Sequence, residues 1–153
     1  MIVAFVLSLL SCHKNDEITG VDRAKALLGQ WEYAAITTDR AVDINGDGIV
    51  NIDLYNTQEI RQCLKDNLTF FTERGVGEKG SYSLNENSLP CSEDTEFSNV
   101  EQDNYELVNN NTVISFDVRN EMRIVKMTQN KLVVDTDDVL GGESVIVTIT
   151  FIK

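Results

Sequence analysis

The sequence predicts an all-β protein, an antiparallel up-and-down β-barrel of about eight strands with one or two short helices. Segments rich in β-branched and aromatic residues recur along the chain, separated by short runs of glycine, asparagine and aspartate. Helical crossovers between these segments are missing, which argues against a parallel sheet. The 153 residues suffice for one domain with a substantial core. An antiparallel sandwich would give the same pattern.

The first expected element is a short helix over residues 21–28, followed by Gly29, which can adopt the left-handed conformation that ends helices. In the last segment Val145, Val147, Ile149 and Phe151 share one face, with Thr148 and Thr150 on the other, as in a half-buried strand. Strands are expected over residues 29–37, 67–73, 81–84, 105–108, 112–118, 122–128, 131–136 and 144–152.

Three connecting stretches carry their own signals. Residues 109–111 are all asparagine, which tolerates positive φ, so we expect a hairpin there. Residues 39–65 contain an acidic loop and then an expected helix over residues 53–64, capped by Asp53. Residues 85–103 are polar and acidic, and we expect them to leave the sheet and to be held by Cys91.

The N-terminal segment predicts export. Residues 1–11 are apolar and uncharged, shorter than the roughly 20 residues of a membrane-spanning helix and typical of a signal peptide. Residues 9–12, Leu-Leu-Ser-Cys, resemble the lipobox of bacterial lipoproteins. The resemblance implies that Cys12 is acylated, that residues 12–19 form a tether similar to those of Bacteroidetes surface lipoproteins, and that residues 20–153 fold. The alternative is a buried N-terminal strand that ends in a core cysteine.

This interpretation places the protein in the cell envelope of a Gram-negative bacterium, attached by its lipid to the outer membrane. It also accounts for the odd number of cysteines, because acylation of Cys12 leaves one pair. If Cys12 carries lipid, Cys63 and Cys91 remain, and a disulfide between them would suit an oxidising compartment. Two separately buried thiols are the alternative. The sequence places no basic partner beside either thiol to make it reactive.

An acidic loop over residues 43–49 resembles the Asp-x-Asn-x-Asp-Gly calcium loops of EF-hands and dockerins. Oxygen atoms recur at alternate positions, and Gly48 stands where such a loop turns sharply. Leu54 occupies the twelfth position of the loop, where an acidic ligand is normal. Asp53 would therefore have to complete the set of calcium ligands one residue early. A plain turn favours the same residues. The candidate ligands of one structural calcium ion are Asp43, Asn45, Asp47, Ile49, Asn51 and Asp53.

Charge and composition exclude several classes of function. The formal net charge of −12 would repel a nucleic-acid backbone. His13 is the single histidine, so a multi-histidine metal site is excluded, and it lies in the N-terminal tail. Phosphate-binding glycine loops and a placed pair of catalytic carboxylates are missing. We therefore expect a protein that is not an enzyme.

The start of the folded region suggests a family. A short helix followed by Gly29-Gln30-Trp31 at the beginning of the first strand resembles the Gly-x-Trp motif of lipocalins. Together with the strand count and the lipobox, it is similar to lipocalin-like domain lipoproteins of Bacteroidetes over residues 20–153. The resemblance implies that Trp31 closes the narrow end of the barrel.

The expected function is therefore that of a membrane-anchored lipocalin-like lipoprotein without catalysis. An eight-stranded barrel can hold one small apolar ligand in its interior, or it can serve a structural role in the envelope. A surface module that binds a protein or a glycan, with side chains filling the barrel, is the alternative. An apolar pocket beneath Trp31 would favour the small ligand.

Overall fold

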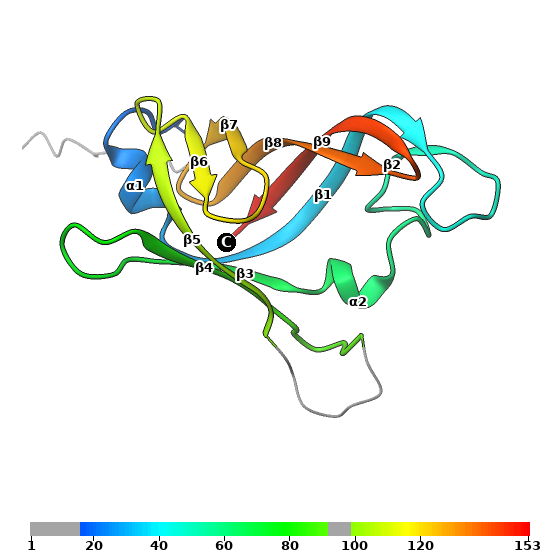
Figure 1. Cartoon of the computed structure of the whole chain (residues 1–153), viewed down its shortest axis with the longest axis horizontal. Helices are drawn as coiled ribbons and strands as arrows, with labels where there is room; N and C mark the ends of the chain where they lie inside the picture. Colours follow the sequence, from blue (N-terminus) through cyan, green and yellow to red (C-terminus); the bar gives the residue numbers. More distant parts are fainter. Residues whose placement is uncertain (1–15, 92–98) are drawn as a thin grey trace, which may run out of the picture.

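Nine antiparallel strands and two short helices make up residues 16–91 and 99–153, the part of the chain that the computed structural model describes (Figure 1). The elements, in chain order, are α1 (Asp22–Leu27), β1 (Gly29–Val42), β2 (Asn51–Asp53), α2 (Gln62–Lys65), β3 (Leu68–Thr72), β4 (Gly80–Asn85), β5 (Asn99–Val108), β6 (Val113–Phe116), β7 (Met122–Met127), β8 (Lys131–Leu140) and β9 (Glu143–Ile152).

The sheet closes on itself through β1. The first residues of β1 pair with β3, and the following residues pair with β9 from Glu32 to Thr38. Between these edges each strand pairs with its neighbour in the sequence, in the order β3-β4-β5-β6-β7-β8-β9. The short β2 pairs only with the far half of β1, so eight of the nine strands form the ring. The predicted eight-stranded up-and-down barrel is confirmed.

The core follows from alternation along the strands. In β9 the predicted inward residues Val145, Val147, Ile149 and Phe151 are all buried, while the threonines between them are more exposed. The expected hairpin turn at residues 109–111 is confirmed, because all three asparagines have positive φ angles, from 52° to 60°. The largest fully buried side chains include Trp31, Tyr82, Phe71, Phe151, Leu27, Leu54, Ile114, Met122, Met127 and Leu132.

The predicted helix over residues 53–64 is wrong, because only Gln62–Lys65 is helical. The Asp53 carboxylate does accept hydrogen bonds from the backbone N–H groups of Tyr55 and Asn56, at 3.1 and 3.0 Å. However, the N–H groups of Leu54 and Tyr55 donate to the carbonyl of Ile36 in β1. These bonds hold the segment beside the strand, so the cap starts a turn and no helix follows.

Several strand boundaries also differ from the expectation, and β8 ends at Leu140, beyond the expected end at residue 136. β1 continues five residues past the expected end at Thr37, because Thr38 pairs with Val147 of β9 and Val42 pairs with Asn51 of β2. Residues 85–103 do not all leave the sheet. β4 includes Asn85 and β5 begins at Asn99, so strand pairing extends into this stretch from both sides.

Residues 1–15, which include Cys12 and His13, lie outside the described residues, as do residues 92–98. Of the expected tether, Ile18 donates a backbone hydrogen bond to Met127 at 2.8 Å, and Glu17 forms an ion pair with Arg23 at 3.6 Å. The described end of the tether therefore lies against the barrel. Within the described ranges, we find no helix with the length and apolar character needed to cross a membrane.

Candidate functional site

Trp31 is completely buried at the α1 end of the barrel. Its indole Nε1 donates to the carbonyl of Leu27, the last residue of α1, at 2.7 Å. The ammonium of Lys153 lies 4.3 Å from the ring centre and donates to the carbonyls of Ala26 and Leu28, at 2.7 and 2.8 Å. Trp31 thus links α1 to the barrel. The sequence analysis missed Lys153, whose position follows from the pairing of Glu32 with Ile152.

The row of paired residues that starts at Trp31 includes polar side chains. Trp31 pairs with Thr69 of β3, Thr69 pairs with Leu84 of β4, and Leu84 pairs with Glu101 of β5. Paired residues point to the same face, so this row of the inner wall includes a hydroxyl and a carboxylate. We call the following residues the interior polar cluster: Tyr33, Asn67, Thr69, Tyr82, Glu101 and Arg119.

Arg119 brings a cation into this cluster from the loop after β6. Its guanidinium lies over two aromatic rings, 4.6 Å from the centre of Tyr82 and 4.9 Å from that of Phe116. Its Nη1 is 3.6 Å from a carboxylate oxygen of Glu101, an ion pair too long for a hydrogen bond. The Arg119 backbone is fixed by Asp103, whose carboxylate accepts from its N–H and from that of Val118, both at 3.1 Å.

The two phenols of the cluster have raised pKa values. Removal from water raises the pKa of Tyr33 and that of Tyr82 above their usual value, because the ionised form loses its hydration. The positive charge of Arg119 opposes this rise in both pKa values, and so do side-chain hydrogen bonds of Tyr33 with Thr69 and of Tyr82 with Arg119. Both side chains therefore carry an O–H group that can donate a hydrogen bond at neutral pH.

Five buried side-chain atoms of the described residues have no hydrogen-bond partner, and all five belong to this cluster. They are both amide atoms of Asn67, the hydroxyl oxygen of Thr69, and Nε and Nη1 of Arg119. Asn67 is 1% exposed and Thr69 is fully buried. Buried polar groups are normally paired, and each unpaired one costs about 1–3 kcal/mol. The unpaired atoms of Asn67 are the clearest of these, because Thr69 and Arg119 also interact with the phenols of Tyr33 and Tyr82.

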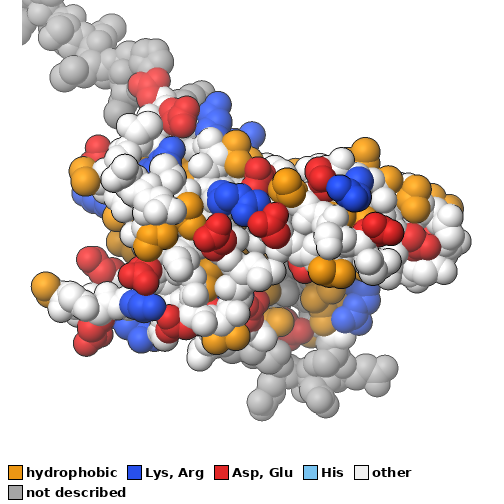
Figure 2. All heavy atoms as spheres, turned by 45° about the horizontal axis from the view of Figure 1, so that its top comes forward, with side chains coloured by type: hydrophobic (Ala, Val, Ile, Leu, Met, Phe, Trp, Pro, Cys, Tyr) orange, Lys and Arg blue, Asp and Glu red, His pale blue; other side chains and the backbone are white. Residues whose placement is uncertain are grey.

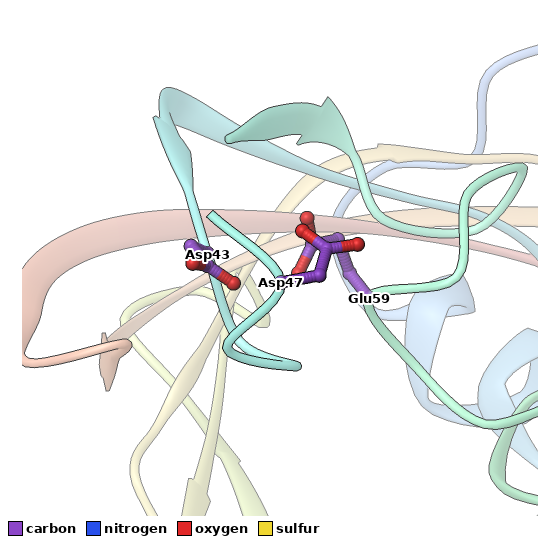
Figure 3. Close-up of side chains that lie close together, drawn as sticks. All are labelled: Asp43, Asp47 and Glu59. Carbon is purple, nitrogen blue, oxygen red and sulfur yellow. The ribbon is translucent and has the colours of Figure 1, made fainter. Parts of the chain in front are cut away.

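The acidic loop lies at the opposite end of β1. Carboxylate oxygens of Asp43, Asp47 and Glu59 come within 4.8 Å of one another (Figure 3). Glu59 is 5% exposed, and one of its oxygens accepts from the N–H of Ile44 at 2.7 Å. Sequence analysis missed Glu59, because it lies beyond the twelve positions of an EF-hand loop. Three convergent carboxylates are hard oxygen ligands of the kind that calcium prefers.

The other predicted ligands lie around this cluster in different ways. The amide of Asn51 donates to Glu59 at 2.8 Å, and that of Asn45 donates to Asp47 at 3.1 Å. The N–H of Ile49 donates to the other oxygen of Asp47 at 2.8 Å. The Asp53 carboxylate instead accepts from Asn56 and from the backbone of the following turn, and these hydrogen bonds lower its pKa.

Cys63 and Cys91 form the predicted disulfide, with their Cα atoms 5.2 Å apart. The bridge joins α2 to the segment after β4. The Cys91 N–H also donates to the Glu86 carboxylate at 2.8 Å. The disulfide therefore fixes two irregular stretches that strand pairing does not hold.

The outer surface carries charges of both signs. On the face shown in Figure 2 acidic and basic side chains are interspersed. Some form exposed ion pairs, such as Arg123 with Asp137 at 2.7 Å and Lys79 with Asp117 at 2.6 Å. Exposed pairs of this kind contribute little to stability.

Comparison with known proteins gives similarity at the level of the fold. No family model and no curated protein matches the chain. A bovine odorant-binding protein, in a deswapped triple mutant, is 16% identical with a TM-score of 0.45, over 84% of this chain and 74% of that one. The siderocalin Ex-FABP, described as functioning through dual ligand specificities, is 9% identical with a TM-score of 0.49, over 83% and 73%. The architecture of this chain rests on its own strand pairing.

Proposed function

We propose that this chain is a non-catalytic, lipocalin-like barrel that binds one small molecule in its interior and is anchored to a bacterial outer membrane by an acylated Cys12. The observation that carries the binding function is the set of buried side-chain atoms of Asn67 and Arg119 without hydrogen-bond partners. A ligand that brings hydrogen-bonding groups would satisfy them.

The interior differs in one respect from the expected apolar pocket beneath Trp31. The residue paired with Trp31 is Thr69, and the buried Asn67 precedes the same strand. A purely apolar ligand would leave these polar atoms unpaired. We therefore propose a ligand that has a polar group as well as an apolar body.

Native mass spectrometry of the protein purified from its own membrane tests this function. We expect a complex of one protein with one small molecule, and the molecule should dissociate when the barrel unfolds. A spectrum that shows only the protein and its own covalent lipid would contradict ligand binding. The same spectrum reports the disulfide as a mass two hydrogen atoms lower than that of the reduced chain.

The membrane anchor is supported by the sequence around Cys12, which lies outside the described residues. Replacing Cys12 with alanine should move the protein from the membrane fraction to the soluble fraction. The expected mature chain begins at Cys12 and carries acyl groups. An unmodified Cys12 in membrane-bound protein would contradict the proposal.

We propose a calcium ion as a structural brace of the acidic loop. Asp43, Asp47 and Glu59 supply three converging carboxylates, and Glu59 comes from the segment after β2. An ion there would join the end of β1 to that segment and would reduce the repulsion among the carboxylates. The proposed role is stability, because neither the loop nor its surroundings contain a group that would react.

Thermal unfolding with calcium and with a chelator tests this brace. Calcium should raise the melting temperature of the natural protein, and Asp43→Asn with Asp47→Asn should abolish the increase. Glu59→Gln tests the ligand found in the structure, and Asp53→Asn tests the ligand expected from the sequence. If Glu59, and not Asp53, completes the ligand set, Glu59→Gln weakens the response and Asp53→Asn leaves it unchanged. A melting temperature that ignores both calcium and chelator would refute the brace.

The alternative is a surface module with a filled barrel, which binds a protein or a glycan. The tight packing around Trp31 favours it, since Trp31, Phe71 and Phe151 are at most 1% exposed. An outer hollow between α1 and the β3–β4 turn contains the exposed Val21 beside Leu28. Under this alternative the mass spectrum would show no small molecule, and binding would be lost through changes at the outer surface.

A further inference from the structure

We propose that the barrel stands on the bilayer with its α1 end, so that the acidic loop points away from the membrane. This inference rests on the proposed lipid anchor, because it names the surface of the protein that meets the lipid. The α1 end consists of residues 16–28 and the β3–β4 turn, residues 73–79. The acidic end consists of residues 39–53 and of residues 137–143 around the β8–β9 turn. These two ends lie at opposite ends of the molecule (Figure 1).

The first support is the place where the tether joins the barrel. The N–H of Ile18 donates to the carbonyl of Met127 at 2.8 Å, and the Ile18 carbonyl accepts from Nε of Arg23 at 2.9 Å. Arg23 belongs to α1 and is 6% exposed. Cys12 lies outside the described residues, six positions before Ile18, and six residues reach at most about 21 Å. The acylated residue is therefore confined to the neighbourhood of the α1 end.

The length of β1 excludes the inverted orientation. β1 runs from α1 to the acidic loop and has 14 residues, which corresponds to about 46 Å along the strand at about 3.3 Å per residue. An inverted barrel would require the tether to span most of that length, which is beyond its reach. Two arrangements remain, because the barrel can stand on its α1 end or lie on its side.

Charge disfavours the barrel on its side. The acidic end has seven acidic side chains and one basic one, Arg40. A further cation, Arg123, pairs with Asp137 at 2.7 Å. The α1 end has five acidic and four basic side chains, and the ammonium of Lys153 also donates to two carbonyls at the C-terminal end of α1. Anionic lipids therefore repel the acidic end more strongly, and an upright barrel holds that end several screening lengths, of about 8 Å each, from the surface.

The α1 end also offers apolar contacts of a kind that suits the lipid interface. Val76 is fully exposed at the tip of the β3–β4 turn. Val21 is 82% exposed, one helical turn from the exposed Lys25. Apolar side chains near cations favour binding at anionic interfaces. The acidic end has exposed apolar residues too, such as Ile49, but the N–H of Ile49 donates to a carboxylate of the acidic loop, which anionic head groups would repel.

Electron paramagnetic resonance of spin-labelled protein tests this orientation. The acylated full chain is reconstituted in vesicles of phosphatidylcholine and phosphatidylglycerol that contain a lipid with a nickel-chelating head group. A nitroxide is attached to one substituted cysteine, Val76→Cys at the α1 end or Ile49→Cys as the matched exposed residue of the acidic end. We expect nickel to enhance relaxation at residue 76 at least about threefold more than at residue 49, which lies several screening lengths further from the head groups.

Two controls accompany this measurement. The natural protein treated with the same reagent should remain unlabelled, because Cys63 and Cys91 form the disulfide and the proposed anchor occupies Cys12. Melting temperatures of the labelled variants check that the barrel is intact. If either variant is unstable, Val21→Cys and Val139→Cys are a second matched pair of exposed residues at the two ends, and their ratio gives the same decision.

Flotation of the vesicles separates this proposal from the anchor on which it rests. Protein that floats with the vesicles is anchored, and within that protein the ratio of the two labelled sites decides the orientation. Equal enhancement at both sites, or greater enhancement at residue 49, would overturn the upright orientation and leave the anchor in place. Natural protein that stays in the soluble fraction would refute the anchor, and the orientation would fail with it.

Discussion

The disulfide between Cys63 and Cys91 allows a stability prediction with a worked magnitude. The two residues are 28 positions apart, and closing a loop of that length in the unfolded chain corresponds to about 3.6 kcal/mol in the chain-entropy model. The bridge also holds α2, a helix of only four residues that could not persist alone. Replacing both cysteines with serine should therefore lower the free energy of unfolding by about 3.6 kcal/mol.

Equilibrium unfolding in guanidinium chloride measures this change. For a domain of this size the loss corresponds to a fall in melting temperature of roughly 7–14 °C. The natural protein under reducing conditions is the matched control and should behave like the double variant. The denaturant dependence should also become steeper, because the open chain exposes more surface when it unfolds. A loss below about 1 kcal/mol would refute the reasoning, since it would mean that the bridge hardly restricts the unfolded chain.

Three further predictions concern the framework of the site. Trp31→Phe removes the bond to Leu27 and should cost about 1–3 kcal/mol in chemical unfolding, whereas an unchanged midpoint would show that this bond is dispensable. Burial would raise the pKa of Asp103, but four backbone hydrogen bonds lower this pKa below 3.8. The Asp103 carboxylate therefore stabilises the fold above pH 3.8, and this stabilisation is lost as the pH falls through the lowered pKa. Asp103→Asn should make the unfolding midpoint fall less steeply at acid pH than it does in the natural protein. Equal slopes for the variant and the natural protein would contradict this. Gly141 has φ +58°, and a Cβ there would lie 2.5 Å from the Asp43 carbonyl oxygen. Gly141→Ala should therefore shift the acidic loop and lower both the melting temperature and the calcium response, and an unchanged calcium response would contradict this.

Most of the barrel is predictable from the sequence, because the alternation of apolar and polar residues in strands and the residues that favour turns are both local signals. The positions of Val145 and Val147 follow from a period of two, and the hairpin at residues 109–111 follows from asparagine's tolerance of positive φ. The helix over residues 53–64 failed for a physical reason. A capping aspartate has the same local hydrogen bonds whether a helix or a turn follows, and the contact with Ile36 that decides between them is distant in the sequence.

The candidate site is less predictable, because its residues come together only through the closed sheet. Arg119 follows a short strand in a polar loop, where a cation is normally solvated, and the sequence does not reveal that it lies over Tyr82. The burial of Asn67 could have been recognised, since it precedes Thr69 and Phe71 at a spacing of two residues and all three are buried. Glu59 joins the acidic loop through a turn whose course no motif specifies.

A high-resolution crystal structure of the protein purified from its own membrane would test the central claim most directly. The prediction is continuous density for one small molecule inside the barrel, in contact with at least one side chain of the interior polar cluster. Separate water molecules at the polar atoms of this cluster, or side chains that fill the space and satisfy them, would contradict a ligand-binding interior and favour a barrel that acts through its outer surface.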